Sequence, residues 1–200
     1  ERGYAIFCSN NARNGPTQLI MDAAEAMFKD VYSRFSLQNK RTCLGGFSGG
    51  SRVSSMIAAM TGKVNTIIGA GAAFSDRIEG LEINFDYYGI TSYLDFNYAE
   101  MMMLEKKLDS LDVNHAFSIF DGMHDWPPPL QIEMAVLWME ITDMKQGIMA
   151  ADETVVKRYE LIMDSLQAAY ADSGRILDQV RTLKNWRNTL AGIGNPERPD

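Results

Sequence analysis

Gly46, Ser48 and Gly50 form a G-x-S-x-G pattern, the spacing of a serine that acts as a nucleophile on a sharp turn between a strand and a helix. A short apolar segment precedes the pattern and a helix-like stretch follows it. Because backbone crowds such a turn on both sides, we expect little room for a Cβ at position 46 or 50. The N–H of Gly49, at the start of the helix, could donate to an oxyanion. Glycine- and serine-rich turns also arise by chance, so the pattern needs partners.

A nucleophilic serine needs a general base, which is usually a histidine. The chain has two histidines, His115 and His124. His115 lies near the start of a predicted strand, whereas His124 lies past that strand, in a loop where the prolines of residues 127–129 exclude regular structure. Ligands of an open parallel sheet bind beyond the carboxyl ends of its strands, so we predict His124 as the base. The alternative is a solvated loop histidine.

The third partner is a carboxylate that orients the histidine, and we look for it between the serine and the histidine in chain order. Asp95 follows a predicted strand and is our candidate for the acid. It also stands where the next predicted helix needs an N-cap, so capping is the alternative. Asp86 is the second candidate but lies inside the predicted strand. Asp121 and Asp125 stand too close in sequence to His124 to orient it.

Three segments together resemble the α/β-hydrolases, in particular bacterial esterases similar to polyhydroxybutyrate depolymerases and feruloyl esterases. They read Gly-Phe-Ser-Gly-Gly-Ser-Arg at residues 46–52, Asp-Phe-Asn-Tyr-Ala-Glu-Met at 95–101 and Phe-Asp-Gly-Met-His-Asp-Trp-Pro at 120–127. The likeness extends over about residues 4–140, and residues 10–15 share it. It implies a serine esterase with a nucleophile elbow, a catalytic triad and an acyl-enzyme. The roles it implies are Ser48 as nucleophile, His124 as base and Asp95 as orienting acid.

Two other functions stay open. A peptidase of the prolyl-oligopeptidase type has the same triad, and a non-catalytic binding module can be built on a hydrolase fold. For the substrate, a small-molecule or polymeric ester, three residues are candidates: Asn11 and Arg13 follow a predicted strand, and Trp126 stands two residues past His124. Each could equally have a structural role.

Composition excludes several classes of function. The net charge of −7 and a pI near 4.9 argue against a nucleic-acid surface. No run of about 18 apolar residues predicts a membrane span. Cys8 and Cys43 lie in separate apolar segments, which favours buried thiols over a disulfide or a metal site, and we expect neither metal nor cofactor. No secretory leader is recognisable, so the compartment is left open between the cytoplasm and, after removal of a leader, the periplasm or exterior.

The predicted elements alternate between strand and helix, which indicates a mostly parallel sheet with helices on both faces, an α/β-hydrolase fold. The expected strands are residues 4–8, 42–47, 64–68, 81–89 and 116–120; the expected helices are residues 17–35, 51–60, 99–111 and from about 130. A helical hairpin, residues 152–171 and 174–190, follows. We therefore divide the chain into a hydrolase core, residues 1–148, and a helical appendage, residues 149–200.

The core is expected to lack the first strands of the family, because only three residues precede the strand predicted at residues 4–8. One of those strands normally supplies the second N–H of the oxyanion hole. A preceding segment would complete the sheet, or the sheet is rearranged, or another copy completes it in a homo-oligomer. We favour the first.

Overall fold

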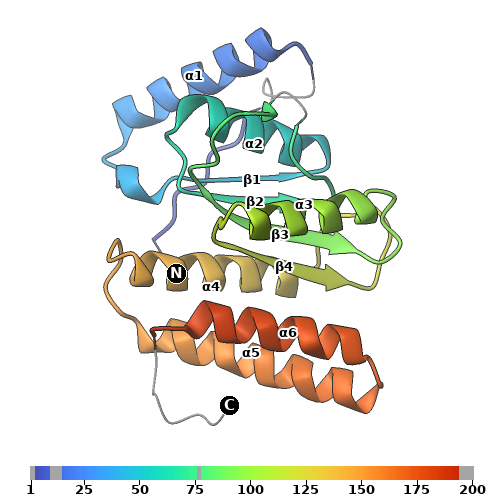
Figure 1. Ribbon diagram of the computed structural model, residues 1–200. Coiled ribbons are helices and arrows are strands. Elements are labelled where there is room, and N and C mark those ends of the chain that lie inside the picture. The colour runs from blue at the N-terminus through green and yellow to red at the C-terminus, as the bar shows by residue number, and fades with distance from the viewer. Residues whose placement is uncertain (1–2, 10–14, 76–77, 194–200) are drawn as a thin grey trace.

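The computed structural model describes residues 3–9, 15–75 and 78–193 of the 200-residue chain. The protein is built around one sheet of four parallel strands, hydrogen-bonded in chain order (Figure 1). Parallel neighbours cannot be joined by a tight turn, so each connection crosses over a face of the sheet. The strands are β1 (Cys43–Phe47), β2 (Thr66–Ala70), β3 (Asp86–Ser92) and β4 (His115–Phe120).

Helices cover both faces of the sheet. On one face Ile67, Tyr87 and Phe117 pack against α2 (Gly49–Thr61) and α3 (Tyr98–Ser110). On the other face Tyr88 and Ile90 pack against α4 (Pro129–Lys145). Successive side chains of a strand point to opposite faces, so the strands are apolar on both. The predicted fold class, a parallel sheet with helices on both faces, is confirmed by α2, α3 and α4.

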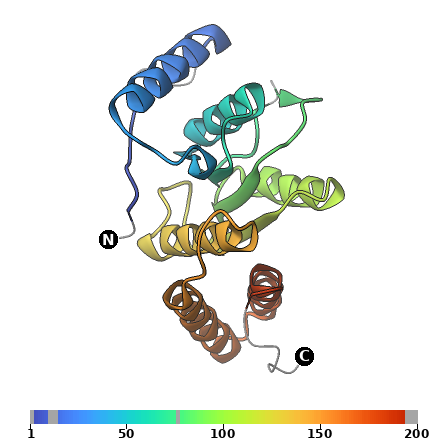
Figure 2. The same ribbon diagram turned by 90° about the vertical axis from the view of Figure 1, so that its left-hand side faces the viewer.

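The first helix stands outside these layers. Helix α1 (Thr17–Arg34) packs on α2 rather than on the sheet, through Ile20 and Ala24 (Figures 1 and 2). A short 3₁₀ turn, η1 (Asn39–Arg41), then leads into β1. The helix lies within one residue of the predicted range, because its apolar residues recur at helical spacing.

Two predicted strands have wrong boundaries. The strand expected at residues 64–68 begins two residues later as β2, and the strand expected at 81–89 is β3, shifted toward the C-terminus. Leu81 lies in a turn with 44% of its surface exposed, whereas the polar Thr91 and Ser92 are buried at the end of β3. The prediction from hydrophobicity began the strand too early and ended it too early, because the strand continues into polar residues that are buried.

The strand predicted at residues 4–8 is wrong. Residues 3–9 adopt no regular structure and take no place in the four-stranded sheet, so β1 is an edge strand of that sheet. The segment is held instead by the Tyr4 hydroxyl, which accepts from Arg41 Nη2 at 2.7 Å and donates to Glu140 Oε1 at 3.2 Å. Burial, together with the charge of Glu140, raises the pKa of Tyr4 above its ordinary value. A polar anchor to α4 thus replaces the expected strand pairing.

The chain ends in the predicted helical hairpin, α5 (Glu153–Asp172) and α6 (Ile176–Leu190), which lies on the outer side of α4 (Figure 2). Val155 and Tyr159 of α5 are fully buried in the cluster that α4 forms with the sheet. Asn185 of α6 donates to the Phe117 carbonyl at 2.7 Å and so occupies a backbone group of the edge strand β4. No helix within residues 3–9, 15–75 and 78–193 combines the length and apolar content that a membrane crossing needs.

Candidate active site

Ser48 is the single residue between β1 and α2, and its backbone is strained. Its φ of 53° and ψ of −118° lie in a region that non-glycine residues rarely adopt, at a cost of about 1–3 kcal/mol. The surroundings hold it there: the Ser48 N–H donates to the Ala70 carbonyl at 2.7 Å, and the Ser51 N–H donates to the Ser48 carbonyl at 3.0 Å. The strand and the helix on either side thus fix the orientation of the serine.

The two flanking glycines have different roles. A Cβ on Gly46 would lie 2.2 Å from the carbonyl carbon of Gly50 and 2.7 Å from the nitrogen of Ser51, so only glycine fits there. A Cβ on Gly50 would meet nothing within 4 Å. The expectation of crowding is therefore confirmed at position 46 and wrong at position 50. Gly50 supplies the backbone that Gly46 approaches, and its own missing side chain would point into open space.

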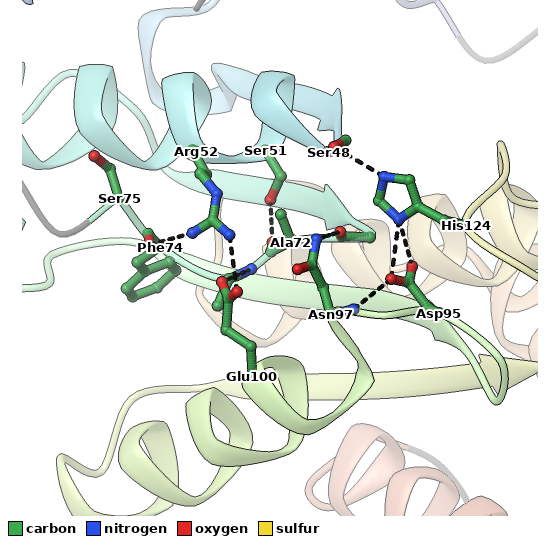
Figure 3. A network of polar contacts seen from close by, with 12 residues as sticks. Ser48, Ser51, Arg52, Ala72, Phe74, Ser75, Asp95, Asn97, Glu100 and His124 are labelled. Atoms are coloured by element: carbon green, nitrogen blue, oxygen red, sulfur yellow. Dashed lines mark hydrogen bonds and ion pairs between the residues drawn. The ribbon is translucent and has the colours of Figure 1, made fainter.

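Ser48, His124 and Asp95 form a continuous hydrogen-bonded line (Figure 3). The Nε2 of His124 lies 2.9 Å from the Ser48 Oγ, and its Nδ1 lies 2.9 Å from each carboxylate oxygen of Asp95. Because Nδ1 faces two acceptors, it carries the proton in the neutral imidazole, and Nε2 is then free to accept from the hydroxyl. Loops beyond the carboxyl ends of β1, β3 and β4 supply the three side chains.

Asp95 is buried, with 2% of its side chain exposed, and its carboxylate is well bonded. Besides the two contacts with His124, its Oδ1 accepts the backbone N–H of Asn97 at 2.7 Å. The N-cap of α3 is Asn97, so Asp95 lies outside the cap position that sequence offered as its alternative role. A buried carboxylate that faces an imidazole and accepts a backbone N–H can orient the ring and stabilise its charged form.

The rejected candidates lie elsewhere. His115 stands at the start of β4, where its Nδ1 lies 2.7 Å from the Val113 carbonyl. Asp86 stands at the start of β3 and accepts from Asn114 at 3.1 Å. Asp121 forms an ion pair with Arg175, which lies in the turn between α5 and α6. His115 and Asp86 therefore lie at the amino-terminal ends of their strands, away from the carboxyl ends where ligands of a parallel sheet bind.

Aromatic rings surround the imidazole. The ring of Phe96 is centred 4.1 Å from that of His124, and the ring of Phe47 is centred 4.7 Å from it. Trp126 packs on Phe47 at 5.2 Å and leaves 71% of its surface exposed beside the site. Sequence reasoning missed Phe47 and Phe96, although each directly neighbours a candidate catalytic residue. These rings place the His124 side chain in largely apolar surroundings.

A second polar network fixes the loop that follows β2 (Figure 3). Arg52 of α2 pairs with Glu100 of α3 at 2.8 Å, and Glu100 accepts the Ala73 N–H at 2.9 Å. Asn97 Nδ2 donates to the Gly71 carbonyl at 2.7 Å. Sequence reasoning did not assign this network. The signal that could have pointed to it is the position of its three side chains within residues 46–52 and 95–101, two of the segments that carry the resemblance: Arg52, Asn97 and Glu100. The network ties the helix behind Ser48 to the helix that follows Asp95.

Two of the residues expected to bind substrate, Asn11 and Arg13, lie outside the described residues. Cys8 is exposed rather than buried, and Cys43 is half-buried; burial raises the pKa of the Cys43 thiol to about 12. Neither cysteine forms a disulfide. In the described part of the chain, no group of three or more His, Cys, Asp or Glu side chains is placed to hold a metal ion.

No protein-family model and no curated protein sequence matches the chain. Among solved structures it is similar to an S-formylglutathione hydrolase from Staphylococcus aureus, with a TM-score of 0.48 and 20% identity over 59% of this chain and 59% of that one. It is also similar to an acylaminoacyl peptidase from Pyrococcus horikoshii, with a TM-score of 0.45 and 13% identity over 64% of this chain and 27% of that one. The chain thus spans less than two thirds of either protein. What it does has to follow from its own residues.

The turn at Ser48 predicts effects of very different size for two alanine substitutions. Gly46→Ala should lower the free energy of unfolding by about 3 kcal/mol or more, since the new Cβ overlaps the Gly50 backbone. Gly50→Ala should leave it within about 1 kcal/mol, because its Cβ enters open space on a helix. Urea unfolding of both variants measures the difference, and equal midpoints would contradict the close approach.

Proposed function

We propose that the protein is a serine hydrolase that cleaves carboxylic esters through an acyl-enzyme. The observation that supports this proposal is the line of hydrogen bonds from the Ser48 hydroxyl through His124 to the buried Asp95 carboxylate. A nucleophile, a base in contact with it and an acid in contact with the base form the minimal machinery of acyl transfer. The strained backbone of Ser48 holds the hydroxyl in that line.

In the proposed cycle, His124 Nε2 takes the hydroxyl proton while the Ser48 Oγ bonds to the ester carbonyl carbon. The tetrahedral intermediate then breaks its bond to the alcohol oxygen, and His124 returns the proton to the leaving alkoxide. Water, deprotonated by His124, attacks the acyl-enzyme, and the acid is released as Ser48 regains its proton. Asp95 keeps the proton on Nδ1 throughout and stabilises the imidazolium that forms twice in each cycle. The reaction needs no metal or cofactor.

Helix α2 supports the developing oxyanion in this scheme. It begins at Gly49, directly after the nucleophile, and has no acidic residue in its first turn. The free N–H groups and the dipole of a helix N-terminus favour negative charge. We therefore assign the Gly49 N–H as an oxyanion donor. In this proposal residues 1–148 make up the hydrolase core, and residues 149–200 are appended to it.

The surface beside the nucleophile favours an ester with an apolar or aromatic group. Phe96 is 77% exposed and Trp126 is 71% exposed, and both rings lie close to the imidazole or to Phe47. Side chains of this kind bury hydrocarbon but offer no acceptor or donor array for a peptide backbone. We propose Trp126 as one wall of the acyl-binding surface.

Substitutions in the triad test the function. With p-nitrophenyl esters, Ser48→Ala and His124→Ala should each abolish measurable turnover, and Asp95→Asn should lower kcat about 10⁴-fold, since the imidazole loses its orienting charge. The matched controls are His115→Gln and Asp86→Asn, which change the rejected candidates at the amino-terminal ends of β4 and β3. Both controls should keep kcat within about threefold of the unsubstituted protein.

Three results would contradict this proposal. Turnover retained in a clean Ser48→Ala preparation would remove Ser48 as nucleophile. Hydrolysis of peptide amides without hydrolysis of aryl esters would indicate the peptidase. A folded protein that binds esters and turns over none would indicate a non-catalytic module on this fold.

The assignment of Trp126 has its own test. Trp126→Ala should raise KM about tenfold for an ester with a long or aromatic acyl group and leave the KM for the acetate ester nearly unchanged, because only the larger group reaches the indole. Leu161→Ala, which removes an exposed apolar side chain from α5, serves as the control. An equal effect on both esters would remove Trp126 from the acyl-binding surface.

A further inference from the structure

The turn between α5 and α6 contacts the loop that carries His124. Arg175 stands in this turn, and its Nη1 donates to Asp121 Oδ2 at 2.6 Å. Asp121 directly follows β4 and lies three residues before His124. A residue of the C-terminal hairpin thus holds the start of the loop that positions the imidazole.

The same turn contacts the loop that carries Asp95. Arg175 Nε donates to Asp178 Oδ2 at 2.8 Å, and the other carboxylate oxygen of Asp178 accepts the Tyr93 hydroxyl. Tyr93 directly follows β3 and lies two residues before Asp95. The Arg175 guanidinium also lies over the Tyr93 ring, 5.4 Å from its centre. One guanidinium therefore reaches both loops, through Asp121 on one side and through Tyr93 and Asp178 on the other.

The two loops also contact each other. The Tyr93 N–H donates to the Phe120 carbonyl at 3.2 Å, and the Leu94 N–H donates to the Gly122 carbonyl at 3.1 Å. These bonds continue the pairing of β3 and β4 past the ends of the strands. A displacement of either loop would therefore move the other. The contacts that Arg175 makes with the two loops thus restrain both of them together.

Arg175 remains a cation in this setting. Burial lowers the pKa of its guanidinium, but the hydrogen bonds to Asp121, Asp178 and Tyr93 outweigh that effect and raise the pKa above its ordinary value. A planar guanidinium can serve two carboxylates at fixed angles, which a single ammonium cannot do.

We propose that Arg175 is a positioning residue that holds the Asp95 and His124 loops in register, so that the carboxylate meets Nδ1 while Nε2 meets the serine. This inference rests on the proposed function. Catalytic geometry is sensitive to such support, because a misplacement of about 1 Å can cost about 10²-fold in rate. The hairpin is then part of the apparatus that aligns the acid and the base, besides covering α4.

A neighbouring ion pair provides the matched control. Arg181, also on α6, donates from Nη1 to both carboxylate oxygens of Glu105 on α3, at 2.7 Å each. Its pair is more buried than the pair of Arg175 with Asp121: 25% and 14% of the two side chains are exposed, against 29% and 72%. If the hairpin were only a brace, loss of either arginine would affect stability, and loss of Arg175 would not selectively change kcat or the exchange of the two loops.

The test compares Arg175→Ala, Arg175→Lys and Arg181→Ala at a temperature where urea unfolding shows each to be folded. In Arg175→Ala, kcat for a p-nitrophenyl ester should fall about 10- to 100-fold with KM nearly unchanged. Amide hydrogen exchange should rise in residues 93–97 and 121–126 of this variant. Arg175→Lys should recover part of kcat, and Arg181→Ala should match the unsubstituted protein in kcat and in the exchange of both loops.

Equal kcat and equal loop exchange in Arg175→Ala and Arg181→Ala would overturn the inference. The exchange measurement also separates it from the proposed function, since it needs no turnover. If the unsubstituted protein hydrolyses no ester, the proposed function fails. Raised exchange in Arg175→Ala alone would then still support the inference that Arg175 holds the two loops in position, and unchanged exchange would overturn that inference.

Discussion

The approach of Gly46 to the backbone of Gly50 is the constraint on which the rest of the site depends. A Cβ at position 46 would lie 2.2 Å from the Gly50 carbonyl carbon, so the turn closes only around glycine. That closure forces Ser48 to a φ of 53°, and the bond from its N–H to the Ala70 carbonyl of the next strand helps to offset the strain. The serine thereby projects past the end of the sheet, where side chains from two other loops can reach it.

The order of the strands determines what lies between these residues. Asp95 and His124 follow the neighbouring strands β3 and β4, but Ser48 follows β1, so the loop after β2 has to pass between them. Gly71 makes this possible: its φ is 65°, and a Cβ there would lie 2.7 Å from the Phe47 ring and 3.2 Å from Asp95 Oδ2. The Asn97 side chain fixes its carbonyl. The distance from the acid to the serine is thus set by backbone as well as by the imidazole.

The three central residues could be predicted from the sequence, but not by elimination alone. Ser48 and His124 followed from the G-x-S-x-G pattern and from the presence of only two histidines, whereas the choice of Asp95 over Asp86 rested most on the resemblance to the α/β-hydrolases. The sequence could not place the segment at residues 4–8, since apolar alternation does not show whether a strand finds a neighbour; the Tyr4 anchor does not depend on that pattern. The expectation that a Cβ at Gly50 would be crowded was wrong, because the two sides of a turn are not equivalent in three dimensions. Contacts of Arg175, 54 residues from Asp121 along the chain, leave no local signal.

The central claim is that Ser48 is a nucleophile activated by His124. The most direct measurement is labelling of the folded chain with a fluorophosphonate, followed by mass spectrometry of the modified peptide, with His124→Ala in parallel. We expect a single adduct on Ser48 that is lost in His124→Ala, since the hydroxyl reacts only when the imidazole takes its proton. An unlabelled Ser48 in the folded protein, or an adduct that forms equally fast without His124, would contradict the account.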